Sequence, residues 1–299
     1  MPDLLVKGQI LGCSTAVAYA VTTETVAEAV LRHDCDPVAA HALGRAMTAS
    51  ILTAAALGDR ERLNVRWAYE GALRNIVVDT GPDGATRAFI APNHLADVAD
   101  EGELYGAEGS LHVMRSREGL ILSQSTIRTE LLEVVEDLNH FLCVSDQVES
   151  AMVATIALAP DPKSPIRISR GLLLQALPDC DLIRFQALRD RIRSPRALGW
   201  MGRPDESDNL VENLLHSITD EVCDRALIRL EPAATPVFRC NCDAEKMGAV
   251  LRALPYEDRM DILRKREPLT VTCRFCGRRY TLSIEDCIRA WNYAGPPPP

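Results

Sequence analysis

The chain has few aromatic residues and no long apolar run. Phe, Trp and Tyr together make up 5% of the 299 residues, although 47% of the sequence is hydrophobic. A core with so few rings must consist of many small contacts between Ala, Val and Leu side chains. No stretch is apolar over the roughly 20 residues that a helix needs to cross a bilayer. We therefore expect no interaction with the membrane.

The sequence also lacks an export signal. The segment Ile10–Cys13 imitates a lipoprotein cleavage box, but Asp3, Lys7 and Gln9 interrupt the apolar run that should precede it. A cytoplasmic protein is therefore expected, and in that compartment thiols stay reduced and permanent disulfides are rare. The ten cysteines of this chain must then be core residues, metal ligands or redox-active thiols.

Familiar catalytic motifs are missing as well. The chain contains no G-x-S-x-G, H-E-x-x-H or G-K-[ST] segment, and its six histidines follow no recognisable spacing. A hydrolase is therefore disfavoured, and we expect that the protein is not an enzyme.

Charge is distributed unevenly along the chain. The net charge is −9, which disfavours broad attraction to nucleic acid or to an anionic membrane. The segment 237–299, however, holds 11 Arg or Lys against 8 Asp or Glu, so it carries +3 and the remainder −12. Arg274, Arg278 and Arg279 contribute to this excess. A zinc-ribbon module that binds nucleic acid therefore stays open as the alternative function, although a solvated basic face is the commoner meaning of such a cluster.

Residues 1–180 have the pattern of an α+β domain. Asp36 and Pro37 are typical of a helix start, and a helical pattern of apolar residues follows. Residues 63–69 alternate between apolar and polar, as in a half-buried strand. Turn signals at 81–84 and 116–119 separate β-like runs. We predict an N-terminal antiparallel sheet with helices packed on it.

Residues 181–236 are predicted to form a helical linker. Two short amphipathic stripes surround a break that contains Pro195, Gly199, Gly202 and Pro204. Helices this short bury little surface by themselves, so they must pack against another element of the protein. The segment is either an ordinary helical connection or a metastable one that can detach and expose its apolar stripes.

Four cysteines in residues 237–299 have the spacing of a zinc site. Cys240 and Cys242 form C-x-C, and Cys273 and Cys276 form C-x-x-C followed by Gly277, with thirty residues between the two motifs. Closing a loop of this length costs about 3 kcal/mol, whereas a structural zinc ion supplies about 10–16 kcal/mol. We therefore predict that these four thiolates hold one Zn²⁺ and stabilise a small C-terminal domain.

The other six cysteines lack partner spacing. Cys287 is expected to pack on a helix that Ser283 caps. The remaining five are interpreted as buried small apolar residues, and these are Cys13, Cys35, Cys143, Cys180 and Cys223. A thioredoxin-like role for the C-x-x-C motif is weak, because a strand rather than a helix is expected after Gly277.

The zinc site could also act as a redox switch. Zinc-bound thiolates are the nucleophiles that peroxide and hypochlorous acid attack. The near-neighbour pairs Cys240–Cys242 and Cys273–Cys276 can close as disulfides, which no longer hold zinc. A purely structural zinc ribbon, whose thiolates resist oxidation, explains the spacing equally well.

The whole chain, from about Leu4 to Trp291, resembles the redox-regulated bacterial heat-shock holdases of the 33-kDa chaperonin family. The C-x-C and C-x-x-C pair near the C-terminus is that family's signature. Three further stretches are similar to it, and these are His33–Pro37 leading into Ala42–Arg45, Glu136–Asp146 and Gly171–Pro178. Arg170 stands where the resemblance predicts a glycine at a turn, and the Arg-rich linker is less acidic than expected.

The resemblance implies an ATP-independent chaperone that is inactive when reduced and zinc-bound. Oxidation is expected to form the disulfides Cys240–Cys242 and Cys273–Cys276, release zinc and unfold the linker. Unfolded client proteins would then bind apolar surface on the N-terminal domain and linker, and the active form would dimerise.

Overall fold

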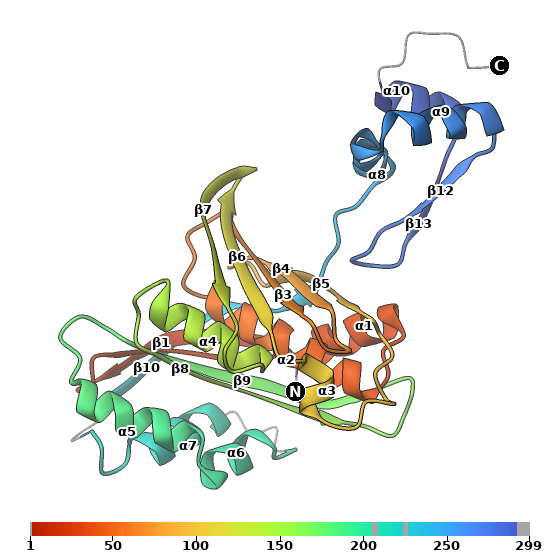
Figure 1. Cartoon of the computed structure of the whole chain (residues 1–299). Coiled ribbons are helices and arrows are strands. Elements are labelled where there is room, and N and C mark those ends of the chain that lie inside the picture. Colours follow the sequence, from red (N-terminus) through yellow and green to blue (C-terminus); the bar gives the residue numbers. More distant parts are fainter. Residues whose placement is uncertain (1, 205–208, 224–226, 292–299) are drawn as a thin grey trace. The chain divides into compact units, whose positions relative to one another are not determined.

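A computed structural model describes residues 2–204, 209–223 and 227–291 (Figure 1). The chain divides into two compact units, unit 1 (Met1–Arg239) and unit 2 (Cys240–Pro299), and each is described by itself. Within the described residues, no helix is long and apolar enough to cross a membrane. The proposed division into segments 1–180, 181–236 and 237–299 remains a prediction.

Unit 1 contains two sheets. Sheet A has the strand order β10-β1-β2-β9-β8, and all of its pairings are antiparallel. Its strands are β1 (Leu4–Leu11), β2 (Thr15–Val21), β8 (Ser150–Leu158), β9 (Ile166–Ala176) and β10 (Leu227–Ala234).

Sheet B has the order β11-β5-β4-β3-β6-β7 and is antiparallel except where β11 joins β5 in parallel. Its strands are β3 (Glu61–Tyr69), β4 (Asn75–Thr80), β5 (Ala85–Ala91), β6 (Gly109–Arg117), β7 (Leu120–Arg128) and β11 (Val237–Phe238). The turns predicted at 81–84 and 116–119 join β4 to β5 and β6 to β7.

Helices fill the space between the two sheets (Figure 1). The central helix α2 begins as predicted, because the Asp36 side chain accepts the amide of Ala39 at 2.8 Å and Pro37 occupies the first turn. Trp67 of β3 is fully buried, and its Nε1 donates to the carbonyl of Val134 at 3.0 Å. The helices of unit 1 outside the linker are α1 (Thr23–His33), α2 (Pro37–Ala54), α3 (Glu101–Tyr105) and α4 (Val134–Val144).

The opposite face of sheet A is covered by three helices, which we call the linker layer. They are α5 (Leu182–Ile192), α6 (Pro195–Met201) and α7 (Leu210–Thr219). The sequence predicted two helices around a break. That prediction was wrong, because Pro195 follows the cap Ser194 at the first turn of α6 and so starts a helix.

The linker layer and sheet A share a second apolar core. Phe185, Leu188 and Ile192 of α5 and Leu214 and Ile218 of α7 are buried. They pack against inward side chains of β1, β2, β8 and β9. The linker therefore covers a large apolar sheet face.

Unit 2 has a smaller core. Among its described residues, Leu251, Leu282 and Cys287 form a buried cluster, and Met260 and Leu263 are also buried. Its elements are α8 (Ala244–Val250), a 3₁₀ turn (Leu251–Ala253), α9 (Tyr256–Lys265), β12 (Leu269–Thr272), β13 (Arg279–Leu282) and α10 (Ile284–Trp291). The fold class is thus α+β with antiparallel sheets, as predicted.

Candidate metal centre

Two short segments of unit 2 bring the four predicted cysteines together. Cys240 and Cys242 lie directly before α8, which starts where the Asp243 side chain accepts the amide of Lys246 at 2.8 Å. Cys273 and Cys276 lie in the turn between β12 and β13. Gly277 has φ 70, the left-handed backbone that this turn requires, and its amide donates to the carbonyl of Cys273 at 2.9 Å.

The sulfur atoms are spaced for a single ion. All four Sγ atoms lie within 4.8 Å of one another. Cys240 Sγ is 3.8 Å from Cys273 Sγ, and Cys242 Sγ is 3.4 Å from Cys276 Sγ. A tetrahedron with zinc–sulfur bonds of about 2.3 Å has sulfur–sulfur edges of about 3.8 Å. This four-cysteine cluster can therefore hold a metal ion of that size.

The pKa values of three of the cluster's thiols are shifted in different directions. Burial raises the pKa of Cys273, and it raises that of Cys276 to about 12. Burial also opposes ionisation of Cys242, but hydrogen bonds from Tyr280 and the neighbouring thiols outweigh it and lower its pKa to about 7. Cys242 therefore ionises before Cys273 and Cys276, whose protons are displaced when a cation binds.

Tyr280 contacts the cysteine cluster and was not predicted from the sequence. Its Oη lies 3.1 Å from Cys242 Sγ and 2.9 Å from the carbonyl oxygen of Cys242. In the sequence, the one feature that could have pointed to Tyr280 is its position four residues after Cys276, on the strand that follows the turn. A donor of this kind orients a metal ligand and stabilises its thiolate form.

Cys287 lies outside the cluster, as predicted. It is fully buried on α10 in the small core of unit 2. Ser283 caps this helix through Oγ, which accepts the amide of Asp286 at 3.2 Å, while Asp286 accepts the amide of Ser283 at 2.9 Å. This capping box fixes Cys287 against Leu251 and Leu282.

The interpretation of the five remaining cysteines needs correction. Cys13 and Cys223 are joined in a disulfide across 210 residues of sequence, so they are not simple core thiols. Cys35, Cys143 and Cys180 are free but only half-buried. Sequence spacing could not reveal the pair, because its two members meet through the packing of the linker layer on sheet A and the pairing of β10 with β1.

Arg170 is also placed differently from expectation. It lies within β9, where it pairs with Val21 of β2, and not at a turn. Its side chain is buried, and Nη1 donates to the carbonyls of Met201 at 3.2 Å and Arg203 at 2.7 Å. The arginine therefore fastens the end of α6 to the sheet.

Two more linker arginines form ion pairs with the body of unit 1. Arg189 lies 2.6 Å from Glu149, and Arg193 lies 2.6 Å from Glu136. These pairs are partly exposed, so each contributes at most about 1 kcal/mol. The Arg-rich stripe of the linker thus has a local structural role.

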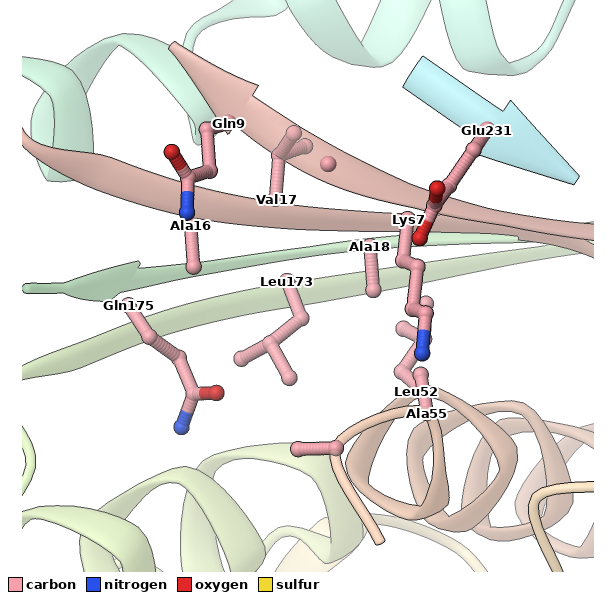
Figure 2. A pocket seen from close by; sticks show the side chains of 12 residues that line it. Lys7, Gln9, Ala16, Val17, Ala18, Leu52, Ala55, Leu173, Gln175 and Glu231 are labelled. Atoms are coloured by element: carbon pink, nitrogen blue, oxygen red, sulfur yellow. The ribbon is translucent and has the colours of Figure 1, made fainter. Parts of the chain in front are cut away.

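A pocket of ≈ 280 Å³ lies between sheet A and the end of α2. Its lining is mainly apolar, and Figure 2 shows Leu173 and Gln175 projecting from the sheet toward α2. Lys7 and Glu231 add one charge of each sign. Within the described residues its lining includes no thiol or imidazole, so it is chemically unrelated to the cysteine cluster.

The fold and the site together define a two-unit α+β protein whose C-terminal unit carries a four-cysteine cluster that can hold a metal ion. A family model described as "Hsp33 protein" matches residues 3–283. The chain therefore belongs to the Hsp33 family, which is a family of chaperones.

Curated relatives and a solved structure agree with this assignment. A 33 kDa chaperonin of Thermus thermophilus is 31% identical, over 93% of this chain and 86% of that protein. The 33 kDa chaperonin of Geobacter sulfurreducens is 29% identical, over 90% and 88%. The crystal structure of a 33 kDa chaperonin from Thermotoga maritima has the same fold, with a TM-score of 0.80, 20% identity and coverage of 98% of this chain and 99% of that one.

Proposed function

We propose that the protein is a redox-regulated, ATP-independent holdase that binds unfolding proteins under oxidative or heat stress and prevents their aggregation. The observation that supports it is the cluster of four sulfur atoms within 4.8 Å, contributed by two segments thirty residues apart. Cys240, Cys242, Cys273 and Cys276 would hold one Zn²⁺ in the reduced, inactive cytoplasmic protein. Four thiolates in a tetrahedral arrangement are a donor set that zinc favours.

Oxidation of the four sulfurs is the proposed trigger. A thiolate attacks a peroxide oxygen and becomes a sulfenic acid as the O–O bond breaks and hydroxide leaves. A second thiolate then displaces the sulfenic hydroxyl and closes an S–S bond. Two peroxide molecules convert the four thiolates into two disulfides, after which the sulfurs can no longer hold the ion.

We further propose the pairing Cys240–Cys242 and Cys273–Cys276. The sulfur distances alone do not select it, because Cys240 Sγ lies 3.8 Å from Cys273 Sγ and Cys242 Sγ lies 3.4 Å from Cys276 Sγ, which are cross-motif contacts. Cysteines two or three positions apart remain neighbours when unit 2 loosens, however, whereas those cross-motif contacts depend on the folded unit. The within-motif disulfides are therefore the ones that persist after the ion is lost.

The linker layer is the proposed gate for client binding. It covers an apolar face of sheet A, and such a face invites aggregation when it is permanently exposed. Loss of the metal would unfold unit 2 and destabilise the layer, and the released apolar face would bind unfolded clients and favour a dimer.

Zinc release and chaperone activity should rise together. The reduced zinc-bound protein is treated with hydrogen peroxide or hypochlorite at elevated temperature. Released zinc is measured with a chromogenic chelator, and suppression of a client's heat aggregation is measured by light scattering. Both signals should reverse with a thiol reductant, and a Cys35→Ser variant should behave like the parent.

Two outcomes would contradict the proposal. They are full suppression of aggregation by untreated protein, and no suppression after complete zinc release.

The alternative nucleic-acid function rests on a different observation. Arg274, Arg278 and Arg279 are exposed around the C-x-x-C turn. If they form a binding face, the chain should bind DNA or RNA with an affinity that falls steeply as salt is raised. The same preparations test this by fluorescence anisotropy.

A further inference from the structure

Cys13 and Cys223 form a pair of cysteines in unit 1, separate in sequence from the four-cysteine cluster of unit 2. The Cα atoms of Cys13 and Cys223 are 5.9 Å apart, and the two residues are joined in a disulfide across 210 residues of sequence. This separation is within the range of roughly 4.4–6.8 Å that a disulfide bridges. Both residues are buried where the linker layer meets sheet A.

Each partner is held in a hydrogen-bonded turn. Cys13 lies between β1 and β2, and its amide donates to the carbonyl of Ile10 at 3.3 Å. Cys223 lies four residues after the last residue of α7, and its amide donates to the carbonyl of Thr219 at 3.0 Å. These hydrogen bonds fix the backbone of both cysteines.

The disulfide lies at a junction of the chain. Helix α7 ends just before Cys223, and strand β10 begins just after it and pairs with β1 from Leu227 opposite Leu11 to Ala234 opposite Leu5. A bond at this point therefore fastens both the last helix of the linker layer and the edge strand of sheet A to the β1–β2 turn.

We propose that Cys13 and Cys223 form a second redox site, a reversible disulfide that restrains the linker layer on sheet A. This inference rests on the proposed function, because it concerns how far the layer opens when the protein is active. The two redox sites act in opposite directions. Oxidation at the four-cysteine centre unfolds unit 2, whereas oxidation of Cys13 and Cys223 holds the end of α7 in place and limits the exposed apolar face.

The chemistry requires only a peroxide. One of the two thiolates attacks the peroxide, the O–O bond breaks, and a sulfenic acid and hydroxide form. The other thiolate then closes the S–S bond as the sulfenic hydroxyl leaves. In total the two thiols lose two electrons and two protons, and the peroxide becomes two water molecules. A surface hollow of ≈ 450 Å³ borders Cys223 and provides the approach.

A third thiol provides a matched control. Cys180 lies just before α5, and its Sγ donates to the carbonyl of Cys13 at 3.2 Å. It therefore contacts the same turn without belonging to the disulfide. A Cys180→Ser variant removes a thiol from the same place and should leave the restraint intact.

The test compares the full-length oxidised protein with a C13S/C223S variant. After peroxide treatment, non-reducing peptide mapping by mass spectrometry should recover Cys13 linked to Cys223. Limited proteolysis should cut residues 210–219 about tenfold faster in the variant, because the restraint on the end of α7 is gone. Oxidised C13S/C223S should also suppress client aggregation at a lower molar ratio than the parent, and Cys180→Ser should match the parent.

Several outcomes would overturn the inference. They are the absence of the Cys13–Cys223 peptide, its replacement by a Cys13–Cys180 peptide, and equal cleavage rates in parent and variant. If C13S/C223S does not fold, C13A/C223A replaces it, since alanine suits two buried positions. If oxidation raises client binding in no variant, the proposed function fails, while the peptide map and cleavage rates still decide on the disulfide.

Discussion

Tyr280 connects strand β13 to the cysteine cluster through a single hydroxyl group. Its Oη lies 3.1 Å from Cys242 Sγ, and that contact contributes to the lowered pKa of this thiol, about 7, against the opposing effect of burial. The residue thus stabilises the ligand in the form that binds a cation. The same Oη also lies 2.9 Å from the carbonyl oxygen of Cys242.

Replacing Tyr280 by Phe should weaken metal binding while leaving the fold unchanged. Loss of an outer hydrogen bond to a metal ligand typically costs 10–100-fold in affinity, and we expect about tenfold here. Competition with a chelator of known affinity measures it. Tyr256→Phe is the control, because Tyr256 is exposed at the start of α9. Equal zinc affinities in the two variants would show that the hydroxyl does not act on the thiolate.

The zinc affinity measured by chelator competition should also depend on pH. Burial raises the pKa of Cys273 and Cys276, so these thiols keep their protons in the metal-free unit and must release them on binding. Zinc affinity should therefore rise from pH 6 to pH 8 in the parent protein and in Tyr280→Phe. A flat profile would mean that the ligands are already ionised before the metal arrives.

The linker layer is held on sheet A by apolar contacts and by a small number of polar ones. Among the polar contacts, the buried Arg170 bonds two carbonyl groups at the end of α6, while the ion pairs of Arg189 and Arg193 are partly exposed. Buried hydrogen bonds to a charged group contribute more than exposed ion pairs. Arg170 is therefore the main polar anchor among these three arginines.

Replacing Arg170 by Met should loosen the linker layer. One buried and one partly buried carbonyl group would lose a charged donor, and we expect about 2–4 kcal/mol less free energy of unfolding. Urea denaturation followed by tryptophan fluorescence gives that value, and proteolysis within 182–223 reports the layer directly. Arg167→Met on the same strand is the control, since Arg167 is exposed. Identical protease sensitivity in both variants would contradict an anchoring role.

At the scale of the whole molecule, the two units differ in what stabilises them. Unit 1 has two extensive apolar cores, one between the sheets and one under the linker layer. In the described part of unit 2, the apolar core is small: Leu251, Leu282 and Cys287 form one buried cluster, and Met260 and Leu263 are also buried. A unit so small needs a metal or a similar constraint to remain folded.

Metal removal should therefore unfold unit 2 and leave the core of unit 1 intact. Chelation of the reduced protein withdraws a binding free energy of about 10–16 kcal/mol, which exceeds the stability that such a core supplies. Hydrogen exchange followed by mass spectrometry should show loss of protection in residues 240–291, with α2 still protected. Unchanged protection throughout unit 2 would mean that its apolar contacts are sufficient.

The amino-acid sequence by itself determined the features that depend on neighbouring residues. The spacing of the four cysteines, the Asp36–Pro37 helix start, the alternation along β3 and the left-handed Gly277 follow from local geometry. Such features are decided within a few residues, so they can be predicted before the fold is known.

Only the tertiary structure decided the contacts between distant segments. Cys13 meets Cys223, Arg170 reaches the end of α6, and the linker forms three helices because sheet A presents an apolar face for them to cover. Each of these contacts depends on how packed elements are oriented, and sequence spacing does not encode that orientation. The metal centre was therefore predicted from the sequence, whereas the restraint on the linker emerged from packing.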